Sequence, residues 1–192
     1  MRKHKNPFHK VKACPGCDLK LHKSKCKSGQ VIGRGDIPAD LLFIGEAPGK
    51  TEDMLGEPFV GPCGNLLQQM IDDACTMAGV LKELKYYITN TVLCRPWIWD
   101  EDDEKFGDNR RPNEEEVLAC MPNIVEIAKV IRPSLVVFVG KISEQYYQKE
   151  FPESISITHP DYHLKFGGKS SPYYRTDIRV LCDAFEEFYA KV

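Results

Sequence analysis

The sequence predicts an α/β protein, a three-layer α/β/α sandwich with a central four-stranded parallel sheet. Two observations lead to this prediction. Short apolar runs typical of buried strands alternate along the chain with longer segments whose apolar residues recur at helical spacing. The run SLVVFVG at 134–140 is apolar almost throughout, as expected for a parallel strand that helices cover on both faces.

Composition narrows the class of protein further. The chain has 192 residues, of which 42% are apolar and 28% charged, enough for one globular domain at 1–192. No apolar run is long enough to cross a bilayer, and no apolar segment follows the basic start, as one would in a secretory signal. We therefore expect a cytoplasmic monomer with no membrane partner.

Positive charge is concentrated at the N-terminus. Residues 1–27 hold nine Lys or Arg and one acid, Asp18, whereas the remainder holds 17 basic and 27 acidic residues. A basic arm on an acidic body predicts that any contact with a polyanion such as DNA is local. We expect 1–13 to be a flexible basic arm, with a purely solvated tail as the alternative.

The first strand and the loop after it organise the chain. The apolar run 41–44 predicts a buried strand that stops at Gly45, and residues 46–49 form a tight loop. In open α/β sheets ligands bind at this carboxyl end of the strands. A second cluster of glycine and proline at 56–64 holds Phe59, whose ring would either line a pocket or fill the core.

The segment GEAPGKT at 45–51 is similar to a phosphate-binding loop but does not match it. That motif needs a glycine, four residues and then Gly-Lys-Ser/Thr, and Ile44 stands where the first glycine belongs. Glu46 would also place a carboxylate against the phosphate. A P-loop nucleoside triphosphatase is therefore the least favoured alternative.

The later elements follow in order. Residues 65–79 predict a helix with Asn65 as its N-cap and Gly79 at its end, and 86–93 predict a strand that contains Asn90. Residues 97–111 form an acidic, irregular insertion. The remaining elements are a helix at 112–131, strands at 134–140 and 154–158 around a helix at 142–150, a loop at 161–174 and a closing helix at 177–190.

Three strand ends are expected to meet at one edge of the sheet. Glu46 follows the first strand, Asn90 lies in or near the end of the second, and His159 follows the last. Each alone has a structural explanation, as a capping glutamate, a strand asparagine or a core histidine. Together with Phe59 they supply a carboxylate, an amide, an imidazole and an aromatic face, which suits a pocket for a planar heterocycle.

Eight cysteines are many for a chain without a secretion signal, where cysteines more often bind metal or do redox work than form disulfides. Cys14 and Cys17 form a CxxC motif with Pro15 and Gly16 between them, a turn that lets two thiolates converge on one metal. A lone CxxC is moderately specific, and Cys26 lies close enough to act as a substitute ligand. These residues predict a metal or redox site near the N-terminus.

A series of motifs resembles one known family. They are GEAPG at 45–49, GEPFVG at 56–61, YITN at 87–90, CRP at 94–96, ACMP at 119–122, LVVFVG at 135–140 and the His-Pro pair at 159–160. In this order they are similar to the family-4 uracil-DNA glycosylases, which carry an iron–sulfur cluster. The resemblance runs from Cys14 to about Leu164, and the GEAPG and GEPFVG pair is its most specific part.

The resemblance implies a fold, an activity and a set of roles. It implies a DNA repair enzyme that flips uracil out of DNA and hydrolyses its N-glycosidic bond, leaving an abasic site, with uracil-containing DNA as the partner. Glu46 would hold the attacking water and His159 would lie beside uracil O2. The substrate-binding residues would be Gly45, Ala47, Glu52, Phe59 and Asn90, with Phe59 stacking on uracil, Asn90 reading its pairing edge and Glu52 crowding the C5 side.

The resemblance also implies a cofactor and a DNA contact. A 4Fe–4S cluster would be held by Cys14, Cys17, Cys94 and Cys120, with zinc as the rival because four cysteines also suit a tetrahedral zinc site. Leu164 and Lys165 would contact DNA after the base is extruded. A catalytically silent module of the same fold that binds uracil or DNA is the main alternative.

Overall fold

The structure is a computed structural model that describes residues 7, 8, 10, 11, 17–21, 29–80, 84–100 and 105–190. Its main sheet has five strands in the order β1-β3-β2-β6-β7. The four strands that the sequence predicts run parallel, and they are β3 (Tyr86–Asn90), β2 (Leu41–Gly45), β6 (Leu135–Val139) and β7 (Ser154–Ile157). The fifth, β1 (Arg34–Gly35), is a short antiparallel edge beside β3, which the sequence prediction lacks.

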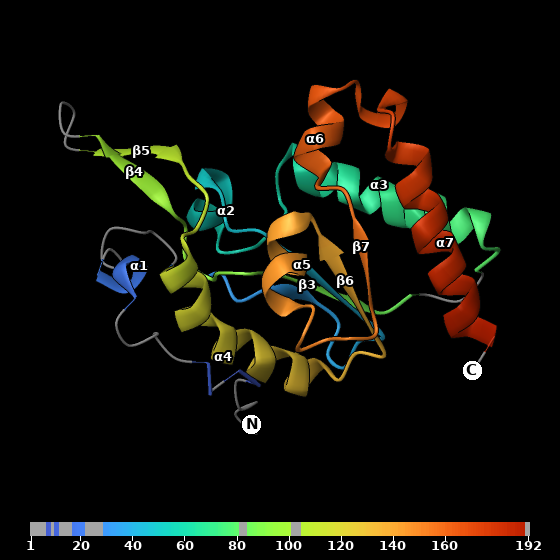
Figure 1. Ribbon diagram of the computed structural model, residues 1–192, viewed down its shortest axis with the longest axis horizontal. Helices are drawn as coiled ribbons and strands as arrows, with labels where there is room; N and C mark the ends of the chain where they lie inside the picture. The colour runs from blue at the N-terminus through green and yellow to red at the C-terminus, as the bar shows by residue number, and fades with distance from the viewer. Residues whose placement is uncertain are drawn as a thin grey trace, which may run out of the picture.

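Helices cover both faces of the sheet and complete the predicted three layers (Figure 1). On one face α4 (Glu114–Ile131) and α5 (Lys141–Tyr147) share a core with Leu42 and Ile44 of β2. On the other, α3 (Pro62–Met77) and α7 (Tyr174–Ala190) share a core with Leu41 and Phe43. Successive side chains of a strand point to opposite faces, so a strand covered twice is apolar at every position.

Helix α4 begins where the sequence predicts. The side chain of its N-cap, Asn113, accepts a hydrogen bond from the backbone N–H of Glu116 at 2.8 Å. The Glu116 carboxylate accepts in return from the backbone N–H of Asn113 at 2.9 Å. This reciprocal capping box satisfies two backbone donors at the start of the helix and fixes where the chain enters it.

Several boundaries differ from the prediction, among them the end of α5, which is Tyr147, and the start of α7, which is Tyr174. Helix α3 begins at Pro62 rather than after Asn65, because proline at a first helical position already has the φ angle of a helix. Strand β3 ends at Asn90 and does not reach 93. Its successor Thr91 turns back to donate its backbone N–H and its hydroxyl to the Gly45 carbonyl, at 2.9 and 2.7 Å.

Within two segments that the sequence predicts to be irregular, the structure describes regular elements. Within 97–111 the strands β4 (Trp97–Asp100) and β5 (Lys105–Asn109) pair as an antiparallel hairpin that projects from the body (Figure 1). Within 161–174 lie α6 (Pro160–Lys165) and a 3₁₀ turn, η1 (Gly168–Ser170). Both predictions were wrong because short elements lack the long apolar period by which a sequence reveals them.

Helix α6 is anchored to α7 by a buried histidine. His163 is 0% exposed, and its ring nitrogens lie 2.9 Å from Oγ of Ser171 and 2.8 Å from Oδ2 of Asp177. Both ring nitrogens therefore have polar partners inside the protein. This arrangement holds the start of α6, and with it His159, at a set position over the sheet.

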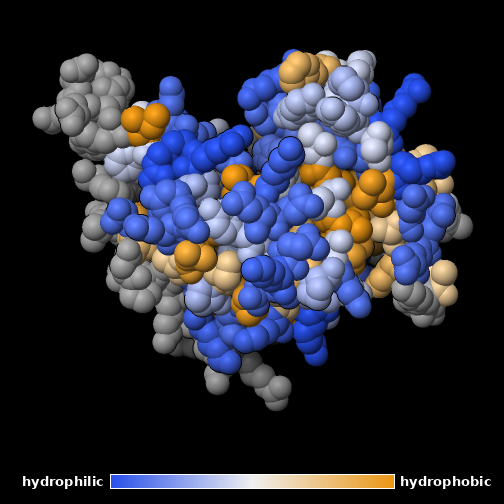
Figure 2. Space-filling view, in the orientation of Figure 1, coloured by the Kyte–Doolittle hydropathy of each residue, from blue (hydrophilic) through white to orange (hydrophobic). Residues whose placement is uncertain are grey.

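The remaining described elements are short. They are α1 (Asp18–Leu21) and α2 (Lys50–Leu55). Of the predicted basic arm at 1–13 the structure describes four residues, and one of them, Phe8, is buried with its ring 5.6 Å from that of Tyr87. Within the described ranges no helix has the length and apolar character needed to span a bilayer. Figure 2 shows a mostly hydrophilic face, with hydrophobic residues gathered beside β7 and α7.

Candidate active site

A cleft of about 610 Å³ opens at the carboxyl ends of the parallel strands. The loop after β2, helix α2, the start of α3, the end of the hairpin and α6 form its walls. Six residues that the sequence singled out line it, namely Glu46, Ala47, Glu52, Phe59, His159 and Lys165. The strand ends therefore meet at one edge of the sheet, as a parallel arrangement requires.

Strands β2 and β3 end side by side against the ring of Phe59, which lines the cleft, whereas Gly45 and Asn90 do not line it themselves. Gly45 pairs with Asn90 in the sheet. A Cβ on Gly45 would lie 2.5 Å from Cζ of Phe59 and 2.6 Å from Oδ1 of Asn90, so only glycine lets the ring and the amide approach so closely. Asn90 is 1% exposed, and neither atom of its amide has a hydrogen-bond partner among the described residues. A buried amide without partners is costly, which indicates a place for a polar ligand.

Phe59 is held in an unusual backbone conformation. Its φ angle is +54°, in the left-handed region that non-glycine residues seldom occupy. The Glu52 carboxylate accepts hydrogen bonds from the backbone N–H groups of Phe59 and Gly49, each at 2.5 Å. Arg34 donates to the carbonyls of Pro58 and Phe59 at 2.9 and 3.1 Å. The three bonds to Pro58 and Phe59 hold this loop so that the Phe59 ring, 4% exposed, lines the cleft.

Glu52 makes contacts beyond its expected role of crowding the C5 side of uracil. Its Oε1 braces Phe59 and its Oε2 accepts from Gly49, the N-cap of α2, and these contacts favour a positioning role. Arg34 completes this brace and was not found by sequence reasoning. No local pattern marks Arg34, because its partners lie 24 and 25 residues further along the chain.

His159 has a defined tautomer. It is the N-cap of α6, and its Nδ1 accepts a hydrogen bond from the backbone N–H of Asp161 at 3.2 Å. Burial lowers the pKa of His159, although the nearby Asp161 carboxylate opposes this effect. A neutral ring that accepts at Nδ1 carries its proton on Nε2. His159 therefore supplies a neutral N–H donor beside Phe59, whose ring centroid is 6.2 Å away.

Glu46 is a partly buried carboxylate at the mouth of the cleft. Burial raises its pKa, Arg111 opposes this rise, and the Asp161 carboxylate adds to it. Its side chain is 28% exposed, and Oε1 lies 3.9 Å from Nε of Arg111. A carboxylate whose pKa is raised holds a proton more readily and is a better base when ionised, as a group that works on water requires.

The two residues expected to contact DNA, Leu164 and Lys165, lie in different places relative to the cleft. Lys165 lines the cleft, where Nζ lies 2.6 Å from Oδ2 of Asp161. Leu164 is 40% exposed on α6 and lies outside the cleft lining. The acid that follows the His-Pro pair is therefore balanced by a lysine one helical turn later.

Three of the four implied cluster ligands lie in one region. Cys17 and Cys120 are buried in the core beneath α4, and Cys94 packs against the same core. Cys14 lies outside the described residues. Within the described part of the chain alone, no group of three metal-ligating side chains is found. The three described thiols belong to one large core but do not form a ligand group by themselves, so a shared cluster with Cys14 stays a prediction.

Comparison with known protein families shows to which superfamily the chain belongs. A model of the uracil DNA glycosylase superfamily matches residues 32–181, which is most of the sequence. The chain belongs to the uracil DNA glycosylase superfamily. The matched span includes Gly45, Glu46, Phe59, Asn90 and His159, whereas Cys14 and Cys17 precede it.

Several curated relatives match the chain over most of its length. A protein named Type-4 uracil-DNA glycosylase from Saccharolobus solfataricus is 37% identical over 140 residues, 73% of this chain and 56% of the relative. One of the same name from Archaeoglobus fulgidus is 35% identical over 163 residues, 83% and 72% of the two chains. A third, from Thermotoga maritima, is 32% identical over 138 residues, 72% and 62%. The chain thus spans little more than half the length of the Saccharolobus relative.

Proposed function

We propose that this superfamily member is a uracil-DNA glycosylase that removes uracil from DNA and leaves an abasic site. The observation that carries the proposal is the buried, unpartnered amide of Asn90 beside the ring of Phe59. A base inside a duplex is out of reach, so the uracil would be extruded into the cleft. The names of the curated relatives support the same activity.

Recognition would depend on Asn90 and Phe59. The Asn90 amide would accept from uracil N3–H and donate to O4. Cytosine has an acceptor at N3 and a donor at N4, so the same amide orientation would leave both pairs mismatched. The Phe59 ring would stack on the base. Because Glu52 and Arg34 hold its backbone, the ring would not move aside to admit a bulkier base.

The chemical step would depend on His159 and Glu46. Breaking the N-glycosidic bond leaves a uracil anion and a cationic sugar. The Nε2–H of neutral His159 would donate to O2 and stabilise the anion, while the Glu46 carboxylate would orient water and favour the cation. Lys165 and Leu164 on α6 would contact the DNA around the extruded base.

A 4Fe–4S cluster is part of the proposal, with Cys14, Cys17, Cys94 and Cys120 as its ligands. When bound, the cluster would join segments that are far apart in the sequence. The purified protein is then expected to be brown, with broad absorption near ~400 nm, and to contain iron and sulfide. Elemental analysis after anaerobic purification measures this, and zinc without iron would contradict the cluster.

The activity itself is tested by cleavage of an oligonucleotide with one uracil, followed by alkali to break abasic sites. We expect cleavage with uracil and none with cytosine or thymine at the same position. The matched control is the same protein with Asn90→Leu. Binding of the uracil oligonucleotide without any cleavage would instead support a catalytically silent module.

A further inference from the structure

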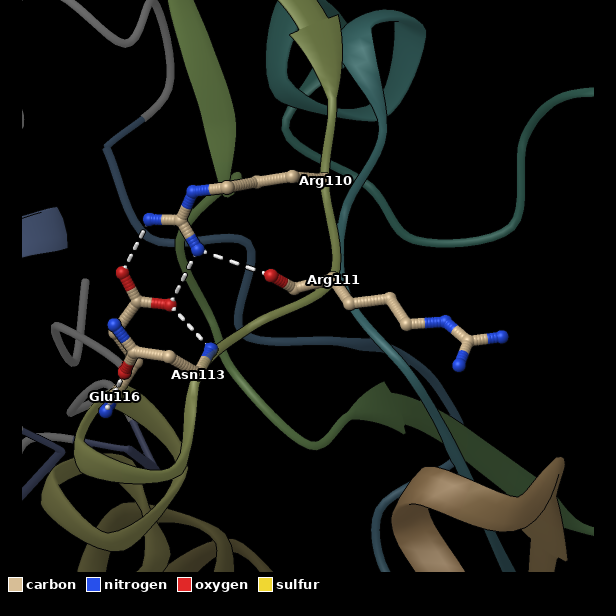
Figure 3. A network of polar contacts seen from close by, with 4 residues as sticks. All are labelled: Arg110, Arg111, Asn113 and Glu116. Carbon is tan, nitrogen blue, oxygen red and sulfur yellow. Dashed lines mark hydrogen bonds and ion pairs between the residues drawn. The ribbon is translucent and has the colours of Figure 1, made fainter.

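Two consecutive arginines after strand β5 point in opposite directions. The guanidinium of Arg110 donates to both carboxylate oxygens of Glu116, at 2.9 and 2.5 Å. Arg111 extends away from this pair and from helix α4 (Figure 3). Because Glu116 is 1% exposed, the Arg110 contact is a built part of the protein. Both arginines line the cleft, and Arg111 is the one that Glu116 does not bind.

The backbone that carries Arg111 is held on both sides. Before it, Arg95 donates to Oδ1 of Asn109 at 2.6 Å and to the Gly107 carbonyl at 2.8 Å. After it, Arg110 donates to the Arg111 carbonyl at 3.0 Å, next to the capping box of α4. The position of Arg111 is therefore set by the structure, even though its side chain is 80% exposed.

Among the charged groups around Glu46, Arg111 is the one that favours its ionised form. Burial lowers the pKa of His159 and so disfavours its charged form, and Lys165 is paired with Asp161. Asp161 and burial both disfavour the ionised form of Glu46, and Arg111 acts against them. Lys50 and Glu52 also line the cleft, but Glu52 uses both of its oxygens on the backbone.

We propose that Arg111 is a positioning residue for the hydrolysis, which keeps the Glu46 carboxylate ionised and turned into the cleft. This role rests on the proposed function of Glu46. A guanidinium at 3.9 Å offsets part of the cost of an ionised carboxylate in a partly buried site. Arg111 reaches Glu46 only because the hairpin, which the sequence predicts as an irregular insertion, fixes the chain at 109–111.

The test is the pH dependence of uracil excision under single-turnover conditions with saturating enzyme, so that DNA affinity does not limit the rate. The wild-type rate should fall as acid protonates Glu46. In Arg111→Gln the pKa of Glu46 should rise, so the acid limb should move to higher pH by about 0.2–0.7 unit, as expected for a pair with one exposed partner. At pH values well above this acid limb the excision rate should be nearly unchanged. In Arg111→Lys the acid limb should return to its wild-type pH.

The matched control is Arg175→Gln, which removes the same charge from an exposed arginine on α7. Its acid limb should coincide with that of wild type. A limb that stays in place in Arg111→Gln overturns the proposal, as does an equal shift in Arg175→Gln. A rate loss of the same size at every pH, which would indicate a phosphate contact, also overturns it.

A second measurement separates this inference from the proposed function. Carbon-13 NMR titration of the Glu46 carboxyl in the full chain reports its pKa without any substrate. A higher pKa in Arg111→Gln than in wild type supports the pair even if the wild-type protein excises no uracil. Equal pKa values overturn the pair even if the wild type is fully active.

Discussion

Glu46→Gln is expected to lower the single-turnover rate of uracil excision by about 10²–10³-fold, and His159→Ala by a similar factor. Each change removes a group that would stabilise the separating charges of uracil and sugar. Binding of uracil DNA should change far less than the rate. Since both groups would act on one transition state, the double variant should lose less than the product of the two single losses.

Thermal stability distinguishes this chemical role of Glu46 from a structural one. The folded-state pKa of Glu46 is raised, so folding favours the protonated form, and the ionised form costs stability once pH rises above the unfolded pKa. Glutamine removes that cost, so Glu46→Gln should keep or raise Tm at neutral pH. A lower Tm with an unchanged excision rate would show that Glu46 is only structural.

His159 needs a control that preserves its helix cap. His159→Asn keeps a side-chain oxygen that can accept from the Asp161 N–H, as Nδ1 of the imidazole does now. It should therefore hold α6 in place but no longer reach the base. We expect Tm close to wild type and an excision rate as low as that of His159→Ala. A wild-type rate in His159→Asn would contradict a chemical role for the imidazole.

Asn90 carries the second large effect. Asn90→Asp replaces the donor to uracil O4 by an acceptor, so transition-state binding should weaken by about 1–3 kcal/mol or more, the usual cost of an unpaired polar group. Because ~1.4 kcal/mol corresponds to a tenfold change, kcat/KM for uracil DNA should fall by roughly 5- to 150-fold or more. The measurement is kcat/KM on a single-uracil oligonucleotide, and unchanged kinetics in a folded variant would remove Asn90 from the pocket.

Asn90→Leu separates recognition from folding. The amide is buried and has no hydrogen-bond partner among the described residues, so it contributes desolvation cost and no compensating bond. An apolar side chain of similar size should therefore keep or raise Tm while excision is lost. If Tm fell sharply instead, the amide would have a structural partner, and its availability to uracil would be refuted.

Much of the fold can be read from the sequence because its signals are local. The run 41–44 is buried in full, and the motif at 112–116 sets the start of α4 through its own capping box. The parallel order of strands then brings Glu46, Phe59 and His159 to one edge, so the main candidates at the cleft follow from position alone. Apolar periodicity and strand ends are properties of short stretches, which a sequence displays directly.

Only the tertiary structure decided how these residues are charged and oriented. That the Asn90 amide lacks partners and that Arg111 faces Glu46 each depend on segments far apart in the chain. The hairpin that places Arg111 has too few residues to show a period, and its position depends on Arg95 and on the start of α4. Burial and pairing across such distances determine the pKa of a side chain, and no short stretch of sequence carries that information.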